Sequence, residues 1–172
     1  MLSVIVLAPS GADPAAGRVH EAVVRSLAAL VGAAVADVVR DACIVGDPSQ
    51  RLASVADHAG CALVEEADPG AGLRKAIAAV RGDRIFVLAA GYAPMSGFND
   101  EMSDWALSAT PPAAALRAEP ASLAQRLFPS WAPCVGVVAM RQDMTTVAAE
   151  SPAELARKLG ARTLVTRARR VV

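Results

Sequence analysis

The residues best suited to chemistry lie in segment 68–75, which reads Asp-Pro-Gly-Ala-Gly-Leu-Arg-Lys. Backbone N–H groups at Gly70 and Gly72, placed before a helix, could surround a phosphate. Arg74 and Lys75, in the first turn of that helix, could neutralise a diphosphate. The segment lacks the six-residue dinucleotide fingerprint and the P-loop lysine. A tight strand-to-helix turn with solvated cations is therefore the alternative interpretation.

Other polar groups give weaker signals. Asp100 and Asp104 are four residues apart, with Glu101 between them, so they could share a helix face and hold a metal ion. An exposed acidic first turn is the alternative. His20 and His58 are isolated, and no Ser, Cys or Asp pattern beside them indicates a catalytic triad.

Apolar runs and helical spacings alternate along the chain and predict the elements that must position these groups. We expect strands over residues 2–8, 42–45, 61–64, 84–90, 113–117, 134–140 and 163–166. Two helices are expected to begin after Asp13-Pro14 and Asp47-Pro48. A third is expected from the glycines at 70 and 72 to Arg81, and three more over 99–109, 121–128 and 153–159. This order predicts an α/β fold with a mostly parallel central sheet flanked by helices.

Ligands of such sheets bind beyond the carboxyl ends of the strands. The candidate site therefore falls near residues 9–10, 46–47, 68–72 and 89–92. Trp131, between Pro129 and Pro133, is expected to anchor a loop, with a role at an acceptor groove or a partner surface as the alternative.

Composition bounds the class of protein. The 172 residues suit one domain. The mean hydropathy of +0.38 excludes a disordered chain. The 17 basic and 17 acidic residues cancel, which argues against nonspecific nucleic-acid binding. No apolar run reaches the roughly 20 residues of a membrane span. Three widely spaced cysteines, Cys43, Cys61 and Cys134, give no zinc or disulfide pattern, and we expect a reduced, cytoplasmic protein.

Four stretches resemble family 2 glycosyltransferases with the GT-A fold. They are residues 2–9 (LSVIVLAP), 39–49 (VRDACIVGDPS), 69–76 (PGAGLRKA) and 82–88 (GDRIFVL), together spanning about residues 1–98. The C-terminal third is similar more loosely, through 136–141 and 153–159. The resemblance implies a single Rossmann-like GT-A-type domain, with a nucleotide-sugar-binding half (1–98) and a shortened acceptor-side half (99–172). It also implies glycosyl transfer from a nucleotide sugar.

The chain departs from three acidic positions of that family. The family's Asp-x-Asp motif holds Mg²⁺ or Mn²⁺ on the donor diphosphate, whereas this sequence has Ala89-Ala90-Gly91 there. The family's catalytic base aligns with Ser151-Pro152, which leaves Glu154 as a weak candidate base and, alternatively, a capping residue. The uracil-reading aspartate aligns with Gly46, one place before Asp47, which could contact a base or serve only as an N-cap.

These observations predict a glycosyltransferase-like protein that is metal-independent or catalytically degenerate, with no metal ligands and no other cofactor. The expected donor-binding residues are Pro9, Ser10, Asp47, Gly70, Gly72, Arg74, Lys75, Ala89 and Gly91. A nucleotide diphosphate sugar is the expected partner, and an oligomer or protein partner is also possible.

A noncatalytic interaction module on the same fold is the alternative, favoured if Tyr92, Met95 or Phe98 fills the cleft. A molybdenum-cofactor-type nucleotidyltransferase is a third and weaker option, because the glycine-rich loop after the first strand is absent.

Overall fold

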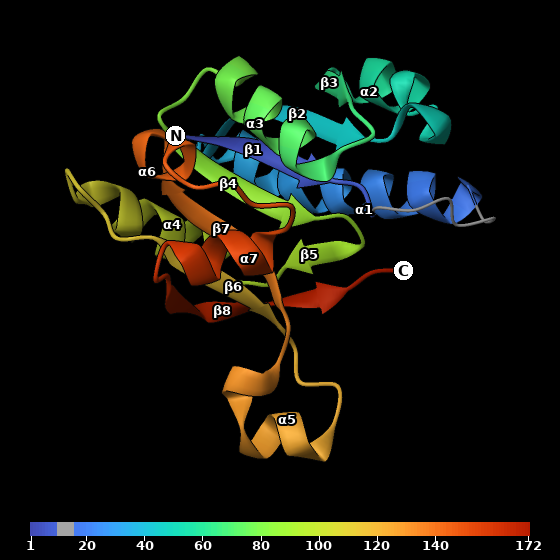
Figure 1. Cartoon of the computed structure of the whole chain (residues 1–172). Helices are drawn as coiled ribbons and strands as arrows, with labels where there is room; N and C mark the ends of the chain where they lie inside the picture. The colour runs from blue at the N-terminus through green and yellow to red at the C-terminus, as the bar shows by residue number, and fades with distance from the viewer. Residues whose placement is uncertain (10–15) are drawn as a thin grey trace.

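The computed structural model describes residues 1–9 and 16–172 (Figure 1). Its strands are β1 (Leu2–Leu7), β2 (Val39–Gly46), β3 (Ala62–Glu65), β4 (Arg84–Ala89), β5 (Tyr92–Pro94), β6 (Ala114–Ala118), β7 (Cys134–Met140) and β8 (Arg162–Arg170). Its α-helices are α1 (Ala16–Val35), α2 (Ala53–Ala59), α3 (Pro69–Ala79), α4 (Phe98–Leu107), α5 (Leu123–Leu127), α6 (Arg141–Thr145) and α7 (Pro152–Lys158). Two 3₁₀ turns, η1 (Pro48–Gln50) and η2 (Pro129–Trp131), complete the described elements.

One sheet with the strand order β3-β2-β1-β4-β7-β6-β8-β5 runs through the described part of the chain. Strands β1 to β4 are mutually parallel, and β6 is parallel to β8. Strand β7 is antiparallel to both β4 and β6, so β6 and β8 point the same way as β1. The carboxyl ends of β1, β2, β3, β4, β6 and β8 therefore meet at one edge of the sheet, which confirms a mostly parallel α/β sheet.

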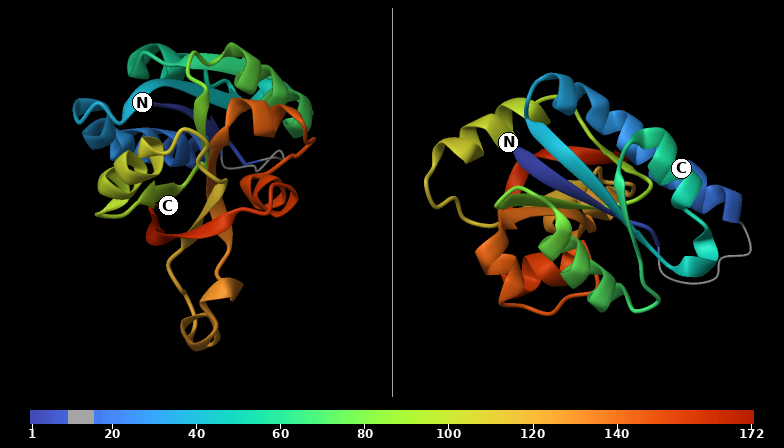
Figure 2. Two further views of the ribbon diagram at one scale, coloured as in Figure 1. Left: turned by 90° about the vertical axis from the view of Figure 1, so that its left-hand side faces the viewer. Right: turned by 90° about the horizontal axis from the view of Figure 1, so that it is seen from above.

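Helices cover both faces of the sheet (Figure 2). On one face, α1 and α4 pack against alternate strand residues such as Val4, Val6 and Phe86. On the other face, α3, α6 and α7 pack against Ile5 and Val87. Alternate side chains of β1 and β4 point to opposite faces of the sheet, and helices bury both faces. Both strands therefore consist of nearly continuous apolar residues. A third apolar cluster joins α1, α2 and β2.

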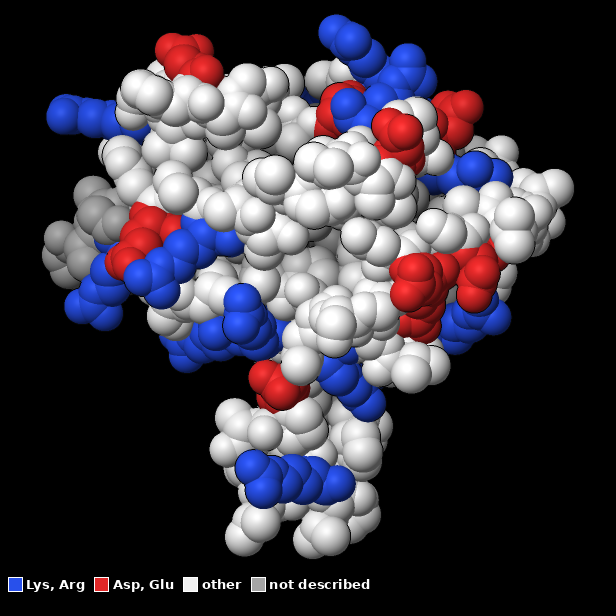
Figure 3. Space-filling view, turned by 180° about the vertical axis from the view of Figure 1, so that it is seen from behind, with Lys and Arg blue, Asp and Glu red and all other residues white. Residues whose placement is uncertain are grey.

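The connection from β6 to β7 projects from the body as an arm, which we define as residues 119–133 (Figure 1). The arm carries α5 and η2, and its surface is mostly uncharged (Figure 3). Phe128 and Trp131 stack with ring centroids 4.9 Å apart, and Trp131 is 64% exposed. Arg117 holds the base of the arm by donating from Nη1 to the carbonyls of Ser130 and Ala132, at 2.8 and 2.7 Å. Trp131 thus belongs to a projecting arm.

Several element predictions need correction. The helix expected directly after Asp47 is η1, which ends at Arg51 in the left-handed region (φ +52°) before α2 begins. The glycine segment is not a loop, because α3 begins at Pro69. Strands β2 and β8 are longer than predicted, and β5 and α6 were not predicted. The start at Asp13-Pro14 lies outside the described residues.

Two smaller points concern the cysteines and the membrane. Cys43 is buried, whereas Cys61 and Cys134 are only partly buried. No helix within the described ranges is both long and apolar enough to cross a membrane.

Candidate functional site

A small open hollow lies at the carboxyl ends of β1, β2 and β3, beside the start of α3. Its lining is formed by Leu7, Ala8, Pro9, Val45, Gly46, Asp47, Glu66, Ala67, Pro69 and Glu150. This is the edge where ligands of parallel α/β sheets bind. The hollow therefore brings together two predicted donor-binding residues, Pro9 and Asp47. Ser10, the third residue predicted near this edge, lies outside the described residues.

Three carboxylates border the hollow: Asp47, Glu66 and Glu150. Hydrogen bonds from the hydroxyl and backbone N–H of Ser49 hold the pKa of Asp47 below its usual value. The hydrogen bond and the positive charge of Lys75 lower the pKa of Glu66. Both groups are therefore ionised at neutral pH. Sequence reasoning missed Glu66 and Glu150 as site residues, because loops from different parts of the chain bring them here.

Asp47 is fixed by local structure. Its carboxylate accepts a hydrogen bond from the Ser49 N–H at 2.8 Å, and the Gln50 side chain bonds back to the Asp47 N–H at 3.0 Å. The predicted N-cap is therefore present, and Gln50 completes a capping box. Gln50 also donates to the Pro9 carbonyl at 2.7 Å, which ties the end of β1 to the turn after β2. Only the part of the Asp47 carboxylate that does not bond to Ser49 is available to a ligand.

The two glycines lie inside α3, so they form no phosphate loop. Asp68 caps the helix by accepting from the Ala71 N–H at 2.7 Å. The Gly72 N–H donates to the Asp68 carbonyl at 2.9 Å. A Cβ on Gly72 would lie 2.7 Å from Val45 Cγ1, so this glycine lets α3 pack closely on β2. Gly70 faces Glu150, whose Cγ would be 3.4 Å from an added Cβ.

The two predicted cations are paired with carboxylates at this edge. Lys75 bonds Glu66 at 2.5 Å, and Arg74 lies 3.9 Å from Asp68. Both cations are more than half exposed, so these pairs contribute little to stability. Because α3 begins at Pro69, both cations lie in its second turn and not in its first turn as predicted. Their side chains remain accessible to an anion.

Neither Ala89 nor Gly91 lines the hollow, and Ala89 is paired with Leu7 of β1 in the sheet. The Ala90 N–H donates to the Leu7 carbonyl at 2.8 Å. The Gly91 N–H is shared between the Ala22 carbonyl at 3.2 Å and Ser26 Oγ at 2.9 Å, and Gly91 has a φ of +87°. The tripeptide 89–91 supplies no carboxylate oxygen, so its side chains do not fit a divalent cation. Nowhere in residues 1–9 and 16–172 do three His, Cys, Asp or Glu side chains converge on a metal-sized space.

Glu154 occupies the N3 position of α7. Its N–H donates to Ser151 Oγ at 3.2 Å, and its carboxylate accepts from the Glu150 N–H at 3.0 Å. Its carboxylate also pairs with Lys158 at 2.8 Å. The hydrogen bond from Lys158, reinforced by that from the Glu150 backbone, lowers the pKa of Glu154. A lowered pKa weakens a general base, and Glu150 rather than Glu154 lines the hollow.

The residues named as possible fillers of the cleft lie elsewhere. Phe98 is buried against Phe86, with ring centroids 5.0 Å apart. Tyr92 is in β5, and Met95 borders a separate surface depression beside α4. None of the three lines the hollow, which stays open to solvent. Glu101 is likewise structural, because its carboxylate accepts from the N–H groups of Val165 and Thr166 at 2.7 and 2.9 Å.

No protein family model matches the sequence, and no curated protein sequence matches it. Solved structures do match its fold. Glucosyl-3-phosphoglycerate synthase from Mycobacterium tuberculosis, in complex with Mn²⁺ and uridine-diphosphate-glucose, is 17% identical with a TM-score of 0.59, over 95% of this chain and 68% of that chain. Mannosyl-3-phosphoglycerate synthase from Rubrobacter xylanophilus is 14% identical with a TM-score of 0.56, over 95% and 65% of the two chains.

A third similar structure is 4-diphosphocytidyl-2C-methyl-D-erythritol synthase, 13% identical with a TM-score of 0.57, over 95% of this chain and 86% of that chain. Identities this low establish the fold and nothing finer. The predicted GT-A type of fold is therefore confirmed.

Proposed function

We propose that this chain binds a nucleotide sugar in the hollow at the ends of β1, β2 and β3 and supports glycosyl transfer without the family's Asp-x-Asp metal site. The observation that carries the proposal is the open hollow bordered by Pro9, Asp47 and Glu66 on a GT-A-type sheet. Two solved structures of this fold contain, by their descriptions, uridine diphosphate or its glucose ester. That supports a uridine nucleotide as the first donor to test.

In this proposal residues 1–98 hold the donor and residues 99–172 form the acceptor side. The exposed oxygen surface of Asp47 accepts hydrogen bonds from the nucleotide base. Arg74 and Lys75 exchange Asp68 and Glu66 for the donor diphosphate. The acceptor hydroxyl oxygen bonds the sugar carbon and loses its proton to water, while the bond from that carbon to the diphosphate oxygen breaks. The two cations stabilise the negative charge left on the diphosphate. Two cations in the second turn of α3 thus take the charge-stabilising role for which residues 89–91 offer no ligand.

A thermal unfolding series tests donor binding. Uridine diphosphate at one hundred times its Kd should add about 2.7 kcal/mol to the stability of the folded chain, in EDTA as well as with Mn²⁺. Arg74→Gln combined with Lys75→Gln should reduce this shift, whereas Arg84→Gln, at the opposite edge of the sheet, should leave it unchanged. A shift that appears only with Mn²⁺ would contradict metal independence. No shift with any nucleotide would contradict donor binding.

The second candidate is a noncatalytic interaction module, and the arm is the observation that favours it. Leu123 and Leu127 are 75% and 76% exposed, beside the stacked pair of Phe128 and Trp131. An apolar tip of this kind is typical of protein contact surfaces. Light scattering on the chain and on a variant with Ser at these four positions tests self-association. A monomer in both cases would exclude a homo-oligomer held by the arm.

A further inference from the structure

Arg167 in β8 has a guanidinium group that the fold leaves partly unsatisfied. Its Nη1 is shielded from solvent and has no hydrogen-bond partner within the described residues. Arg167 lies directly opposite Arg117 in the parallel pairing of β8 with β6. Leu164 and Ala168 of β8, and Leu116 and Ala118 of β6, point to the α1 and α4 face. Strand alternation therefore puts both arginines on the opposite face.

Neither arginine forms an ion pair in the described part of the chain, although Arg167 also borders the depression beside α4 that Glu101 and Asp104 line. Arg117 donates from Nε to Thr163 Oγ1 at 3.4 Å and from Nη1 to the two arm carbonyls, which leaves its Nη2 without a hydrogen bond to any described residue. Like charges at directly paired positions are destabilising, and a buried unpartnered N–H adds a further cost. A buried group left without a partner calls for a missing ligand or another explanation.

The pair lies at the functional edge of the sheet. Arg117 is the penultimate residue of β6, and β6 and β8 end at the same edge as β1 and β2. Arg117 pairs with Cys134 of β7, whose Sγ is 3.9 Å from the Pro152 carbonyl. Pro152 follows Glu150, a residue lining the hollow, by two positions. In the strand order, β4 and β7 separate β6 from β1, so the arginines lie on the same edge of the sheet as the hollow but are not part of its lining.

We propose that Arg167, with Arg117 beside it, binds a tetrahedral oxyanion carried by the acceptor substrate, namely a phosphate group. This inference rests on the proposed function, because it assigns the acceptor to the arginine side of the hollow. Guanidinium groups suit this ligand, since their planar N–H forks match two phosphate oxygens at once. A phosphate would supply both the missing acceptor for Arg167 Nη1 and the missing negative charge between the two cations.

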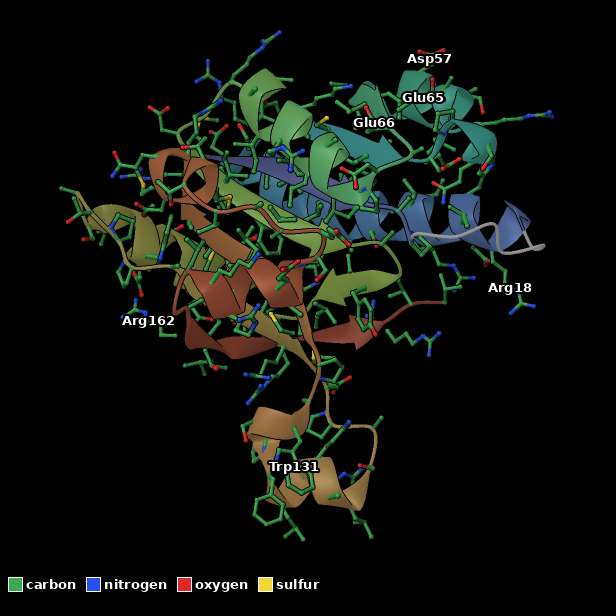
Figure 4. The ribbon with its side chains drawn as sticks, in the orientation of Figure 1. Arg18, Asp57, Glu65, Glu66, Trp131 and Arg162 are labelled. Atoms are coloured by element: carbon green, nitrogen blue, oxygen red, sulfur yellow. The ribbon has the colours of Figure 1, made fainter. Side chains whose placement is uncertain are left out.

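Calorimetric titration of the full chain with inorganic phosphate, with and without saturating uridine diphosphate, tests the site. Arg167→Gln should weaken phosphate binding at least about tenfold, while Arg162→Gln should not change it. Arg162 is the matched control because it lies exposed at the opposite end of the same strand (Figure 4). Phosphate should bind equally well when uridine diphosphate is present. Competition between the two would overturn the acceptor assignment and give the oxyanion site to the donor diphosphate.

A stability measurement separates a ligand site from a structural arginine. If Arg167 is kept for a ligand, Arg167→Met should raise the melting temperature without phosphate and abolish its rise with phosphate. A lower melting temperature with an unchanged response to phosphate would overturn the proposal. Uridine diphosphate binding without phosphate binding would overturn the oxyanion site alone. Phosphate binding that depends on Arg167, without nucleotide binding, would instead overturn the proposed function and the acceptor role.

Discussion

At the residue scale, Gly72 determines how closely α3 approaches β2. A Cβ at this position would meet Val45 Cγ1 at 2.7 Å and Glu66 Cβ at 3.3 Å. Val45 is buried and its branched side chain has few alternative rotamers, so the contact cannot be relieved cheaply. The same contact places Glu66 at the rim of the hollow. Gly72 is thus a packing residue that shapes the site.

Gly72→Ala should lower the free energy of unfolding by about 1 kcal/mol, because overpacking outweighs the gain in helix propensity. Gly32→Ala is the matched control, since Gly32 also lies inside a helix but an added Cβ would meet nothing within 4 Å. The control should gain about 0.5–1 kcal/mol. Urea unfolding measures both, and equal gains in the two variants would contradict the packing role.

Glu154 gives a prediction about pH. Because its pKa is lowered in the folded chain, its ionised form stabilises the fold above the unfolded pKa of about 4.3, and this contribution is lost as pH falls through the lower folded value. Glu154→Gln keeps a capping side chain but loses the ion pair with Lys158. The variant should be less stable than the natural chain at pH 7, with the difference closing below about pH 4.

Thermal unfolding between pH 3 and 7 measures that difference. The same variant tests the candidate base, since a general-base role predicts loss of transfer activity, whereas a role limited to capping and ion pairing leaves that activity unchanged. A difference in stability that stays constant across this range would contradict the pairing with Lys158.

Short-range features of the site could be predicted, and long-range ones could not. The Asp47 capping box depends on residues within three positions of one another, so its spacing alone indicates it. Glu150 reaches the hollow only because α7 packs on β7 and the sheet places β7 two strands from β1. No local pattern marks such a residue. The pairing of Lys75 with Glu66, nine positions apart, was missed for the same reason.

At the element scale, the Glu101 carboxylate fastens α4 to β8. It accepts from two consecutive backbone N–H groups, those of Val165 and Thr166. Burial alone would raise the pKa of Glu101, but the hydrogen bonds from Thr166 and Val165 lower it. The carboxylate satisfies donors of β8 at a point where the pairing with β5 has not begun. The sequence suggested a possible metal site at Asp100, Glu101 and Asp104. Glu101 instead acts as a structural clamp, because its hydrogen bonds hold α4 against β8.

Glu101→Ala should therefore destabilise the chain by about 2 kcal/mol, since hydrogen bonds to a charged group contribute about 1.5–3 kcal/mol each and water recovers part of the loss. For this chain length the melting temperature should fall by roughly 4–8 °C. Asp104→Ala, an exposed change in the same helix, should shift stability by less than about 0.5 kcal/mol. Comparable losses in the two variants would refute the clamp.

The elements that were predicted well have strong local patterns. Strands β1, β4 and β7 are apolar runs buried on both faces, so composition alone marks them. Strand β8 extends to Arg170 although its second half alternates arginine with small residues, and this half was missed because tertiary pairing with β5 and β6 creates it. Strand β5 has three residues and no periodicity to detect.

At the scale of the whole molecule, the antiparallel strand β7 joins the two halves of the sheet, which are the proposed donor and acceptor sides. It inserts between β4 and β6, so the parallel half of the sheet and the β6–β8 half end at the same edge. The hollow, the start of α7 and the paired arginines consequently share that edge. The arm departs from the same end of β6 and carries its apolar tip away from the body (Figure 1). Strand order of this kind cannot be read from one sequence, because β7 and β1 look alike in composition.

The central claim is that a donor nucleotide binds at the ends of β1, β2 and β3, and titration of uridine-diphosphate-glucose into ¹⁵N-labelled protein in EDTA tests it most directly. Saturable shifts are expected for the backbone amides of Ala8, Gly46 and Ala67, and for residues at the start of α3, with the amides of α5 unmoved. The absence of shifts at millimolar ligand, or shifts confined to the arm, would rule out donor binding in this hollow.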